Sequence, residues 1–296
     1  MTSQNLIVAD GFNLSDLAAE MGATAEEQTS GARLPLLKTN RRIKDENKKS
    51  LPLGAFYLTG QDKIAYAVSE AGNPIVKFRP LSHHFQYTHY DAEKDTFVSK
   101  SRQIASFTEE ARSTNGMLRC GKPDGKTMRT LTPEERTKYK AIKNTRLIRG
   151  LVSYTGETAE GEKVTYTNEP CLIKLTGQNN FASSDKGVYA RFDAQVRDLI
   201  PRGYEMWNFD LDIHADEHTS DDGSMFWHTF EWSLNPKDPQ AMTQDVYDSV
   251  VHIAETIRKE NAEVDAAYFD AVKQQAGIDG AIRSLGDDLD DDFEAA

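Results

Sequence analysis

The sequence contains little cysteine and no long apolar run. Its two cysteines, Cys120 and Cys171, are too few for the disulfide framework of a small secreted protein. The first ten residues lack the basic and apolar stretches of a signal peptide, and no apolar run approaches the ~20 residues that span a bilayer. These absences predict a cytoplasmic protein that is not inserted in a membrane.

The motifs of common cofactor and metal sites are missing as well. The segment 121–127 looks like a phosphate-binding loop, but Cys120 stands where such a loop has its first glycine, and Pro123 removes a backbone donor. No CxxC pair supports a zinc site. We therefore expect no cofactor, no resident metal, no catalytic residues and no nucleotide hydrolysis.

Charge is divided unevenly along the chain, although the net charge of −12 hides this. Residues 31–150 carry 24 basic against 12 acidic side chains, a balance of +12, whereas residues 1–30, 151–235 and 236–296 carry −5, −9 and −10. A strongly basic segment inside an acidic protein is typical of proteins that bind a polyanion. Lysines and arginines that only solubilise loops are the alternative interpretation.

The order of strands and turns predicts a β-rich α+β protein with mostly antiparallel strands and peripheral helices. Apolar runs separated by glycine and proline turns predict strands over 55–58, 64–68, 75–79, 81–90, 96–104, 146–154, 164–167, 171–175, 204–215 and 225–234. Thr132, Pro133 and Glu135 have the spacing of a helix start with a capping box. Helical periodicity predicts further helices over 14–21, 188–199 and 240–276, the last with a break near Asn261.

Basic side chains lie near aromatic ones in the predicted strands. Phe85 and Tyr87 share one face of the strand 81–90, and Lys100 and Arg102 lie on the strand that follows. Rings that stack on bases, beside cations that contact phosphates, are what single-stranded nucleic acid requires. The candidate nucleic-acid-binding residues are Arg41, Arg42, Lys77, Arg79, Phe85, Tyr87, Lys100, Arg102, Arg119, Lys122, Lys126, Arg129, Arg136, Lys140, Lys143, Arg146 and Arg149. The alternatives are ordinary core aromatics and a solvated basic surface.

The last part of the sequence is acidic and carries a late phenylalanine. Its acidic residues are Asp287, Asp288, Asp290, Asp291, Asp292 and Glu294, and Phe293 lies among them. Such a block repels itself and buries too little apolar surface to offset its ordering entropy, so we expect a disordered tail. The predicted division is an N-terminal arm with a short helix over 1–30, a β-rich nucleic-acid-binding body over 31–235, a helical segment over 236–277 and the acidic tail over 278–296.

A basic β-rich body followed by such a tail resembles the replication-type single-stranded-DNA-binding proteins, including those of bacteriophages. In that family the aromatic residue lies at or next to the chain end, whereas three residues follow Phe293 here. The resemblance implies an OB-fold-like barrel that binds single-stranded DNA without sequence preference in replication or recombination, in the host cytoplasm for a viral protein. It also implies that the tail shields the groove and recruits replication or recombination proteins through Asp287, Asp288, Asp290, Asp291, Asp292 and Phe293. The helical segment would pack on the body or support a homo-oligomer.

Two other functions are compatible with the sequence. Asp210, Asp212, His214 and Asp216 share one face of the strand that begins at Tyr204. Carboxylates and imidazole at this spacing bind divalent metals for phosphodiester hydrolysis, so a metal-dependent nuclease is the enzymatic alternative. Alternating polar residues are equally typical of a half-exposed antiparallel strand. A viral structural or assembly protein, whose basic segment contacts an acidic partner, is the other alternative.

Overall fold

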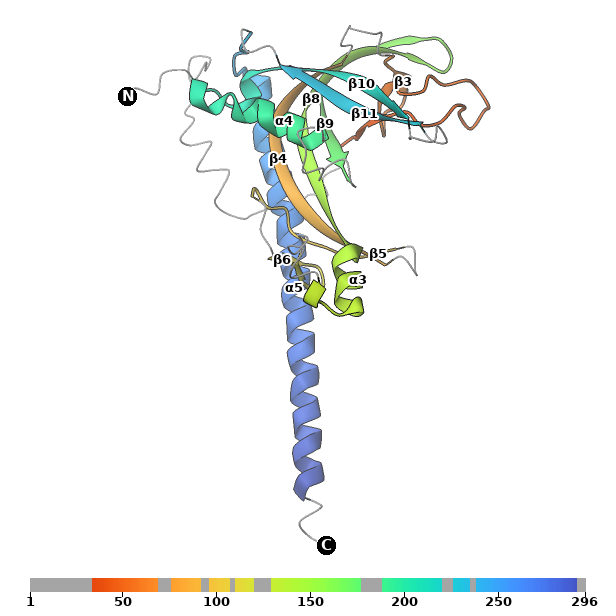
Figure 1. The fold of residues 1–296 in the computed structure, drawn as a ribbon. Helices are drawn as coiled ribbons and strands as arrows, with labels where there is room; N and C mark the ends of the chain where they lie inside the picture. Colours follow the sequence, from red (N-terminus) through yellow and green to blue (C-terminus); the bar gives the residue numbers. More distant parts are fainter. Residues whose placement is uncertain are drawn as a thin grey trace. The chain divides into compact units, whose positions relative to one another are not determined.

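The computed structural model describes residues 34–68, 76–91, 96–106, 110–119, 129–176, 188–219, 226–234 and 238–291. These residues form two compact units, each made from separate parts of the chain. Unit 1 contains the described residues up to His84 and those from Thr145 to Thr256, and unit 2 contains those from Phe85 to Asn144 and from Ile257 onward. The strands β4 (Val76–Asp91) and β8 (Ile142–Thr158) and the helix α5 (Gln244–Asp291) each contribute to both units (Figure 1).

Antiparallel strands dominate unit 1, as predicted. Its other elements are β1 (Leu37–Thr39), β2 (Phe56–Leu58), β3 (Ala65–Tyr66), β9 (Lys163–Leu175), α4 (Val188–Arg197), the 3₁₀ helices Ile200–Arg202 and Met206–Asn208, β10 (Leu211–Thr219) and β11 (Phe226–Leu234). The ladders β1–β2, β3–β8, β4–β10, β8–β9 and β10–β11 are all antiparallel. The large sheet has the order β11-β10-β4-β8-β3, with β9 paired to β8. It is an open sheet in the described part of the chain, so the expected closed barrel is wrong.

Single bridges connect the short sheet of β1 and β2 to the large sheet. Phe56 and Ala67 exchange two backbone hydrogen bonds of 2.9 and 2.8 Å, which places β2 beside β3. Leu172 on β9 donates a backbone hydrogen bond of 2.8 Å to Pro35 and forms a parallel bridge with Leu36. The strands β1, β2, β3, β8 and β9 therefore lie each beside the next, but the start of β1 meets β9 through a single bridge and not through a ladder, so these described strands do not form a closed barrel.

Two long strands, β8 and β9, replace the three shorter strands predicted over 146–175. Gly156 lies inside β8, and a Cβ there would come within 2.9 Å of the carbonyl carbon of Tyr66, so this glycine permits the close approach of β3. The turn is at Gly161, whose φ of +83° favours glycine. Pro170 is accommodated within β9, opposite Leu151. Gly156 and Pro170 thus lie within long strands, whereas we predicted that strands end near them.

The predicted hairpin and amphipathic helix meet around Trp232. Its indole N–H donates a hydrogen bond of 3.1 Å to the carbonyl oxygen of Val188 at the start of α4. The rings of Phe78 and Phe192 lie 6.4 and 5.5 Å from the Trp232 ring, so β4, β11 and α4 share one core. The hairpin β10–β11 is confirmed, but its first strand begins at Leu211 rather than Tyr204 because a 3₁₀ helix precedes it.

Unit 2 also contains β5 (Thr96–Lys100), β6 (Glu110–Ser113), β7 (Gly116–Arg119) and α3 (Pro133–Ala141). The predicted capping box at the start of α3 is confirmed. The hydroxyl of Thr132 accepts a hydrogen bond of 3.2 Å from the Glu135 backbone, and the Glu135 carboxylate accepts one of 2.7 Å from the Thr132 backbone. Two backbone donors at the helix start are satisfied in this way.

The helix α5 is continuous through Asn261, so the predicted break there is wrong. The Asn261 side chain instead binds the backbone of Gln103, accepting from its N–H at 2.6 Å and donating to its carbonyl oxygen at 3.1 Å. The predicted apolar stripe, Val246, Val250, Ile253 and Ile257, is buried. The helix also extends to Asp291, whereas we expected a disordered tail from residue 278. No helix of the described residues is long and apolar enough to cross a membrane.

Candidate nucleic-acid interface

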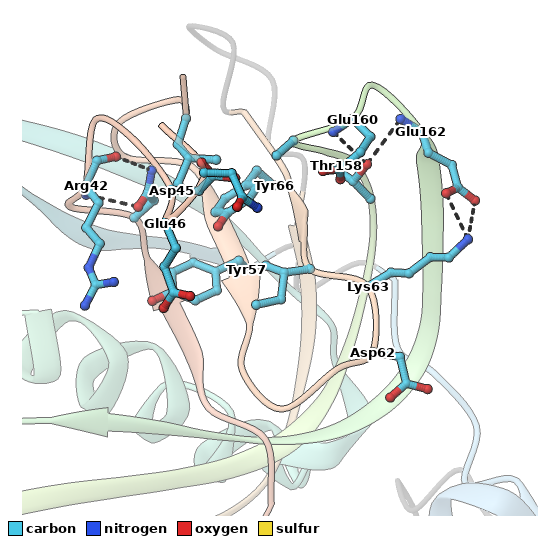
Figure 2. Close-up of a pocket in the computed structure, with 15 residues that line it drawn as sticks. Arg42, Asp45, Glu46, Tyr57, Asp62, Lys63, Tyr66, Thr158, Glu160 and Glu162 are labelled. Atoms are coloured by element: carbon cyan, nitrogen blue, oxygen red, sulfur yellow. Dashed lines mark hydrogen bonds and ion pairs between the residues drawn. The ribbon is translucent and has the colours of Figure 1, made fainter. Parts of the chain in front are cut away.

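Two tyrosines lie side by side in unit 1, Tyr57 on β2 and Tyr66 on β3 (Figure 2). Their ring centroids are 5.5 Å apart and their ring planes are inclined by 42°. Successive side chains point to opposite faces of a strand, and the neighbours Phe56, Leu58 and Ala65 are buried. Both tyrosines therefore point away from the core and stay partly exposed. We name these two residues the ring pair.

A buried phenol links the two strands that carry the ring pair. The Tyr154 hydroxyl accepts a hydrogen bond of 3.1 Å from the Leu58 backbone and donates one of 3.2 Å to the carbonyl oxygen of Ala65. Burial raises the pKa of Tyr154, so its phenol keeps the proton that it donates. Because β2 and β3 are only a few residues long, this link helps to set the spacing of the ring pair.

The ring pair lines a cavity of about 760 Å³. Figure 2 shows that the loop between β1 and β2 lies on one side of the rings and the turn between β8 and β9 on the other. The charged side chains that line the cavity are Arg42, Asp45, Glu46, Asp62, Lys63, Glu160 and Glu162. The cavity therefore combines two flat rings with two cations and five carboxylates.

The loop 41–49, which we name the basic arm, has a defined backbone. At its start, the Asn40 side chain donates a hydrogen bond of 2.9 Å to the carbonyl oxygen of Arg42. At its tip, the Lys48 backbone donates one of 3.0 Å to the carbonyl oxygen of Asp45, and Lys48 adopts a φ of +64°. A preformed loop loses less conformational entropy on binding than an irregular one.

The basic arm is positively charged. Its acidic residues are Asp45 and Glu46, and its basic residues are Arg41, Arg42, Lys44, Lys48 and Lys49. All the basic side chains except that of Lys49, which pairs with Glu160, extend as exposed groups with no ion pair to another described residue. The arm thus offers cations to an anionic ligand at the rim of the cavity.

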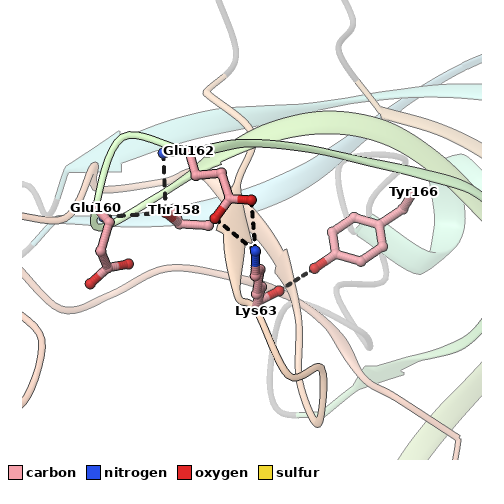
Figure 3. A network of polar contacts seen from close by, with 5 residues as sticks. All are labelled: Lys63, Thr158, Glu160, Glu162 and Tyr166. Carbon is pink, nitrogen blue, oxygen red and sulfur yellow. Dashed lines mark hydrogen bonds and ion pairs between the residues drawn. The ribbon is translucent and has the colours of Figure 1, made fainter.

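The turn 158–162, which we name the acidic turn, carries the carboxylates of Glu160 and Glu162, and Figure 3 shows Glu162 paired with Lys63. The Thr158 hydroxyl accepts hydrogen bonds of 3.2 and 3.3 Å from the backbone N–H groups of Glu160 and Glu162. Lys63 Nζ donates to both Glu162 oxygens at 2.7 and 2.8 Å, and Lys49 Nζ lies 2.6 Å from Glu160. The hydrogen bond from Lys49 lowers the pKa of Glu160. Two of the five carboxylates are therefore neutralised by lysines.

The hydroxyl of Tyr66 stays protonated at neutral pH. Burial raises the pKa of Tyr66, and the neighbouring Tyr57 and Asp45 add to this, while Arg42 opposes it. A neutral phenol next to a carboxylate keeps a hydrogen-bond donor in the cavity beside the aromatic faces.

The structure does not offer the rings of Phe85 and Tyr87 to a ligand. Phe85 is 8% exposed and Tyr87 is fully buried. Tyr87 packs against Ala111 and Leu118 of the hairpin β6–β7, which covers this face of the strand. The prediction that these two rings stack on bases is wrong, because a covering hairpin cannot be inferred from the strand's own alternation.

Several predicted cationic residues serve the fold instead. Arg79 pairs with Asp210 at 2.9 Å, and Arg102 lies 3.4 Å from Asp265. Arg136 donates to backbone carbonyl oxygens next to α3. The guanidinium of Arg146 lies 4.4 Å from the centre of the Tyr189 ring, and Arg149 is 2% exposed. These contacts make Arg146 and Arg149 core residues rather than phosphate ligands.

The remaining candidates are divided between the two units. Those with exposed side chains are Arg41, Arg42 and Lys77 in unit 1 and Lys100, Arg129 and Lys143 in unit 2. Lys122 and Lys126 lie outside the described residues, as do the side chains of Arg119 and Lys140. Of the tail residues, Asp287, Asp288, Asp290 and Asp291 belong to α5, and Asp292 and Phe293 lie outside the described residues. Only Arg41 and Arg42 lie on the basic arm beside the ring pair.

The residues of the nuclease alternative, Asp210, Asp212, His214 and Asp216, do not assemble a metal site. Asp210 pairs with Arg79, and Asp216 lies 3.4 Å from His218. Over the ranges that the structure describes, no three His, Cys, Asp or Glu side chains are grouped so that they could hold a metal ion. The alternation itself is confirmed, since Leu211 and Ile213 are buried, but it reflects a half-exposed strand.

Comparisons with protein-family models, with curated proteins and with solved structures found no match to this chain.

Proposed function

We propose that this protein binds single-stranded DNA without requiring a defined recognition sequence, through the ring pair and the basic arm. The observation that carries the proposal is the combination of two outward ring faces on neighbouring strands with exposed cations on the loop beside them. Stacking of a base on an aromatic ring contributes ~1–3 kcal/mol and tolerates any base. Cations of the arm would contact the phosphates that flank the stacked base.

The position of the site supports an OB-fold-like mode of binding. OB-folds bind oligonucleotides on the face of their second and third strands and with the loops that follow the first and fourth strands. In the series β1, β2, β3, β8 and β9, the ring pair lies on the second and third strands. The basic arm and the acidic turn follow the first and fourth. This correspondence favours nucleic acid over other ligands, although the strands do not close into a barrel.

The role in replication or recombination rests on the acidic tail. In this proposal, the tail competes with DNA for the cationic residues and recruits replication or recombination proteins. Four of its acidic residues, Asp287, Asp288, Asp290 and Asp291, belong to the end of α5, where the helix dipole disfavours negative charge. A cationic partner bound at this end would offset that unfavourable interaction, which favours recruitment of such a partner. A viral origin, a cytoplasmic location and self-association belong to the same proposal.

The test is a titration of a labelled oligonucleotide of about 16 nucleotides, near the largest site size of one OB-fold. Fluorescence anisotropy is measured at about 50 and about 200 mM salt, since phosphate contacts make affinity fall with salt. Tyr57→Ala and Tyr66→Ala should each weaken binding roughly 5- to 150-fold, the effect of losing one stacked base. Arg41→Glu with Lys44→Glu should weaken binding and flatten its salt dependence by about 0.7 in slope for each lost contact.

Matched controls exist elsewhere on the chain. Phe97 is 66% exposed on β5, and Lys163 is exposed on β9, and neither lines the cavity. Phe97→Ala and Lys163→Glu should leave affinity close to that of the unchanged protein. Equal losses in the controls and in the ring-pair variants would refute the site. No titratable binding at either salt concentration would refute the function and favour a structural protein.

A further inference from the structure

We propose that the cavity admits a base with its phosphates outside and selects bases that carry an exocyclic amino group over thymine. The inference rests on the proposed function and names the specificity of the same site. Its observations are the carboxylates that line the cavity together with the ring pair, and the exposed cations Arg41, Lys44 and Lys48, which belong to the basic arm but not to that lining.

Charge determines which part of a nucleotide enters. Of the five carboxylates in the lining, Glu160 and Glu162 pair with Lys49 and Lys63. Asp45, Glu46 and Asp62 remain, against the single cation Arg42. A phosphate placed in the cavity would meet this net negative charge and be repelled, whereas the same phosphate at the exposed arm would meet cations. The uncharged base is therefore the part that reaches the rings.

Hydrogen-bond chemistry then discriminates among bases. An ionised carboxylate only accepts hydrogen bonds, so it pairs with the amino groups of cytosine N4 and adenine N6. Thymine presents the O4 carbonyl oxygen at the position of that amino group, and this oxygen would face a carboxylate oxygen with no proton between them. The discrimination of one well-placed pair is roughly 5- to 150-fold.

The position of Glu46 suits this role. Figure 2 shows the Glu46 side chain extending from the basic arm toward the Tyr57 ring, whereas the Asp62 side chain, on the turn between β2 and β3, points away from the ring pair. Asp45 uses one carboxylate oxygen to accept the Lys49 backbone N–H at 2.7 Å, which fixes its side chain. Glu46 is thus the specificity-determining residue, and Asp45 assists from a fixed position.

The same arrangement excludes duplex DNA from the cavity. In a duplex, one N–H of each cytosine or adenine amino group pairs with the opposite strand, and the ring faces are covered by stacked neighbours. Only an unstacked base can present a free ring face to the ring pair. Selectivity for single strands therefore follows from the cavity and not from the arm.

The experiment compares oligodeoxycytidylate, oligodeoxyadenylate and oligothymidylate of equal length as competitors for a labelled mixed-sequence strand. The full chain should bind the cytosine and adenine strands about 5- to 100-fold more tightly than the thymine strand. Glu46→Gln retains the shape but adds a donor, so it should tighten thymine binding and reduce the preference to about twofold or less. Glu263, an exposed carboxylate on α5, does not line the cavity, so Glu263→Gln is the matched control and should retain the full preference.

The outcomes distinguish a failure of the base selectivity from a failure of the proposed function. Equal or tighter binding of the thymine strand, together with a loss of affinity in Tyr57→Ala, overturns the base selectivity and leaves the proposed function standing. A preference that survives in Glu46→Gln overturns the assignment to this carboxylate. Absence of binding to every strand overturns the proposed function and the selectivity with it.

Discussion

Protonation of His84 should destabilise unit 1 as the pH falls from neutral to acid. Burial, together with the charge of Arg149 and the neighbouring His83, lowers the pKa of His84 from 6.5 to about 4. The folded protein therefore holds His84 neutral, while the unfolded chain takes up a proton near pH 6.5. The contribution of neutral His84 to the free energy of unfolding is fully present above pH 6.5, falls between pH 6.5 and 4, and is absent below pH 4. Since a shift of one pKa unit corresponds to 1.36 kcal/mol, this contribution is about 3 kcal/mol.

The measurement is urea unfolding followed by tryptophan fluorescence at several pH values between 7.5 and 4. The difference in unfolding free energy between these limits should be about 3 kcal/mol smaller in His84→Gln than in the unchanged protein, since glutamine does not titrate. His252 is exposed on α5, so His252→Gln is the matched control and should leave the difference unchanged. Identical pH profiles for the unchanged protein and His84→Gln would refute the reasoning.

Three further predictions concern the close packing at Gly150, the helix cap at Thr132 and the acidic tail. Gly150→Ala would place a Cβ 2.1 Å from the carbonyl oxygen of Arg79, so urea unfolding should show a loss of about 1–3 kcal/mol, and an unchanged midpoint would contradict this close packing. Thr132→Ala removes the hydrogen bond to the Glu135 backbone and should lower hydrogen-exchange protection in α3 by the equivalent of about 1 kcal/mol; full protection would show that the cap is dispensable. Deleting residues 286–296 should tighten binding to single strands at low salt, measured by anisotropy, and unchanged or weaker binding would contradict competition by the tail.

Elements with strong local signals were predictable from the sequence. The capping box at Thr132 needs only residues that are three apart, and the hairpin β10–β11 follows from alternation on both of its strands. Elements that depend on distant residues were not predictable. Asn261 looked like a helix break, yet its side chain binds the backbone of Gln103, 158 residues away in the chain. The closure of a sheet likewise depends on which distant strands meet.

The candidate site was likewise predictable from the sequence only in part, because the exposure of its residues depends on distant parts of the chain. Phe85 and Tyr87 lie on a strand next to basic residues, and Tyr57 has a similar sequence context. Tertiary packing decides which of these rings are covered, and it covers Phe85 and Tyr87. A signal for Tyr57 was present, because it alternates with the buried Phe56 and Leu58 and follows a basic loop. For Arg146 and Arg149, no pattern along the chain distinguishes a buried arginine from an exposed one.

The most direct test of the account is to locate a bound base. A strand that carries 5-iododeoxycytidine is cross-linked to the full chain by light, and the modified residue is identified by mass spectrometry of the peptides. The account predicts adducts on Tyr57 or Tyr66, which should disappear in the corresponding alanine variants. Efficient cross-linking confined to other residues, with neither tyrosine modified, would contradict it.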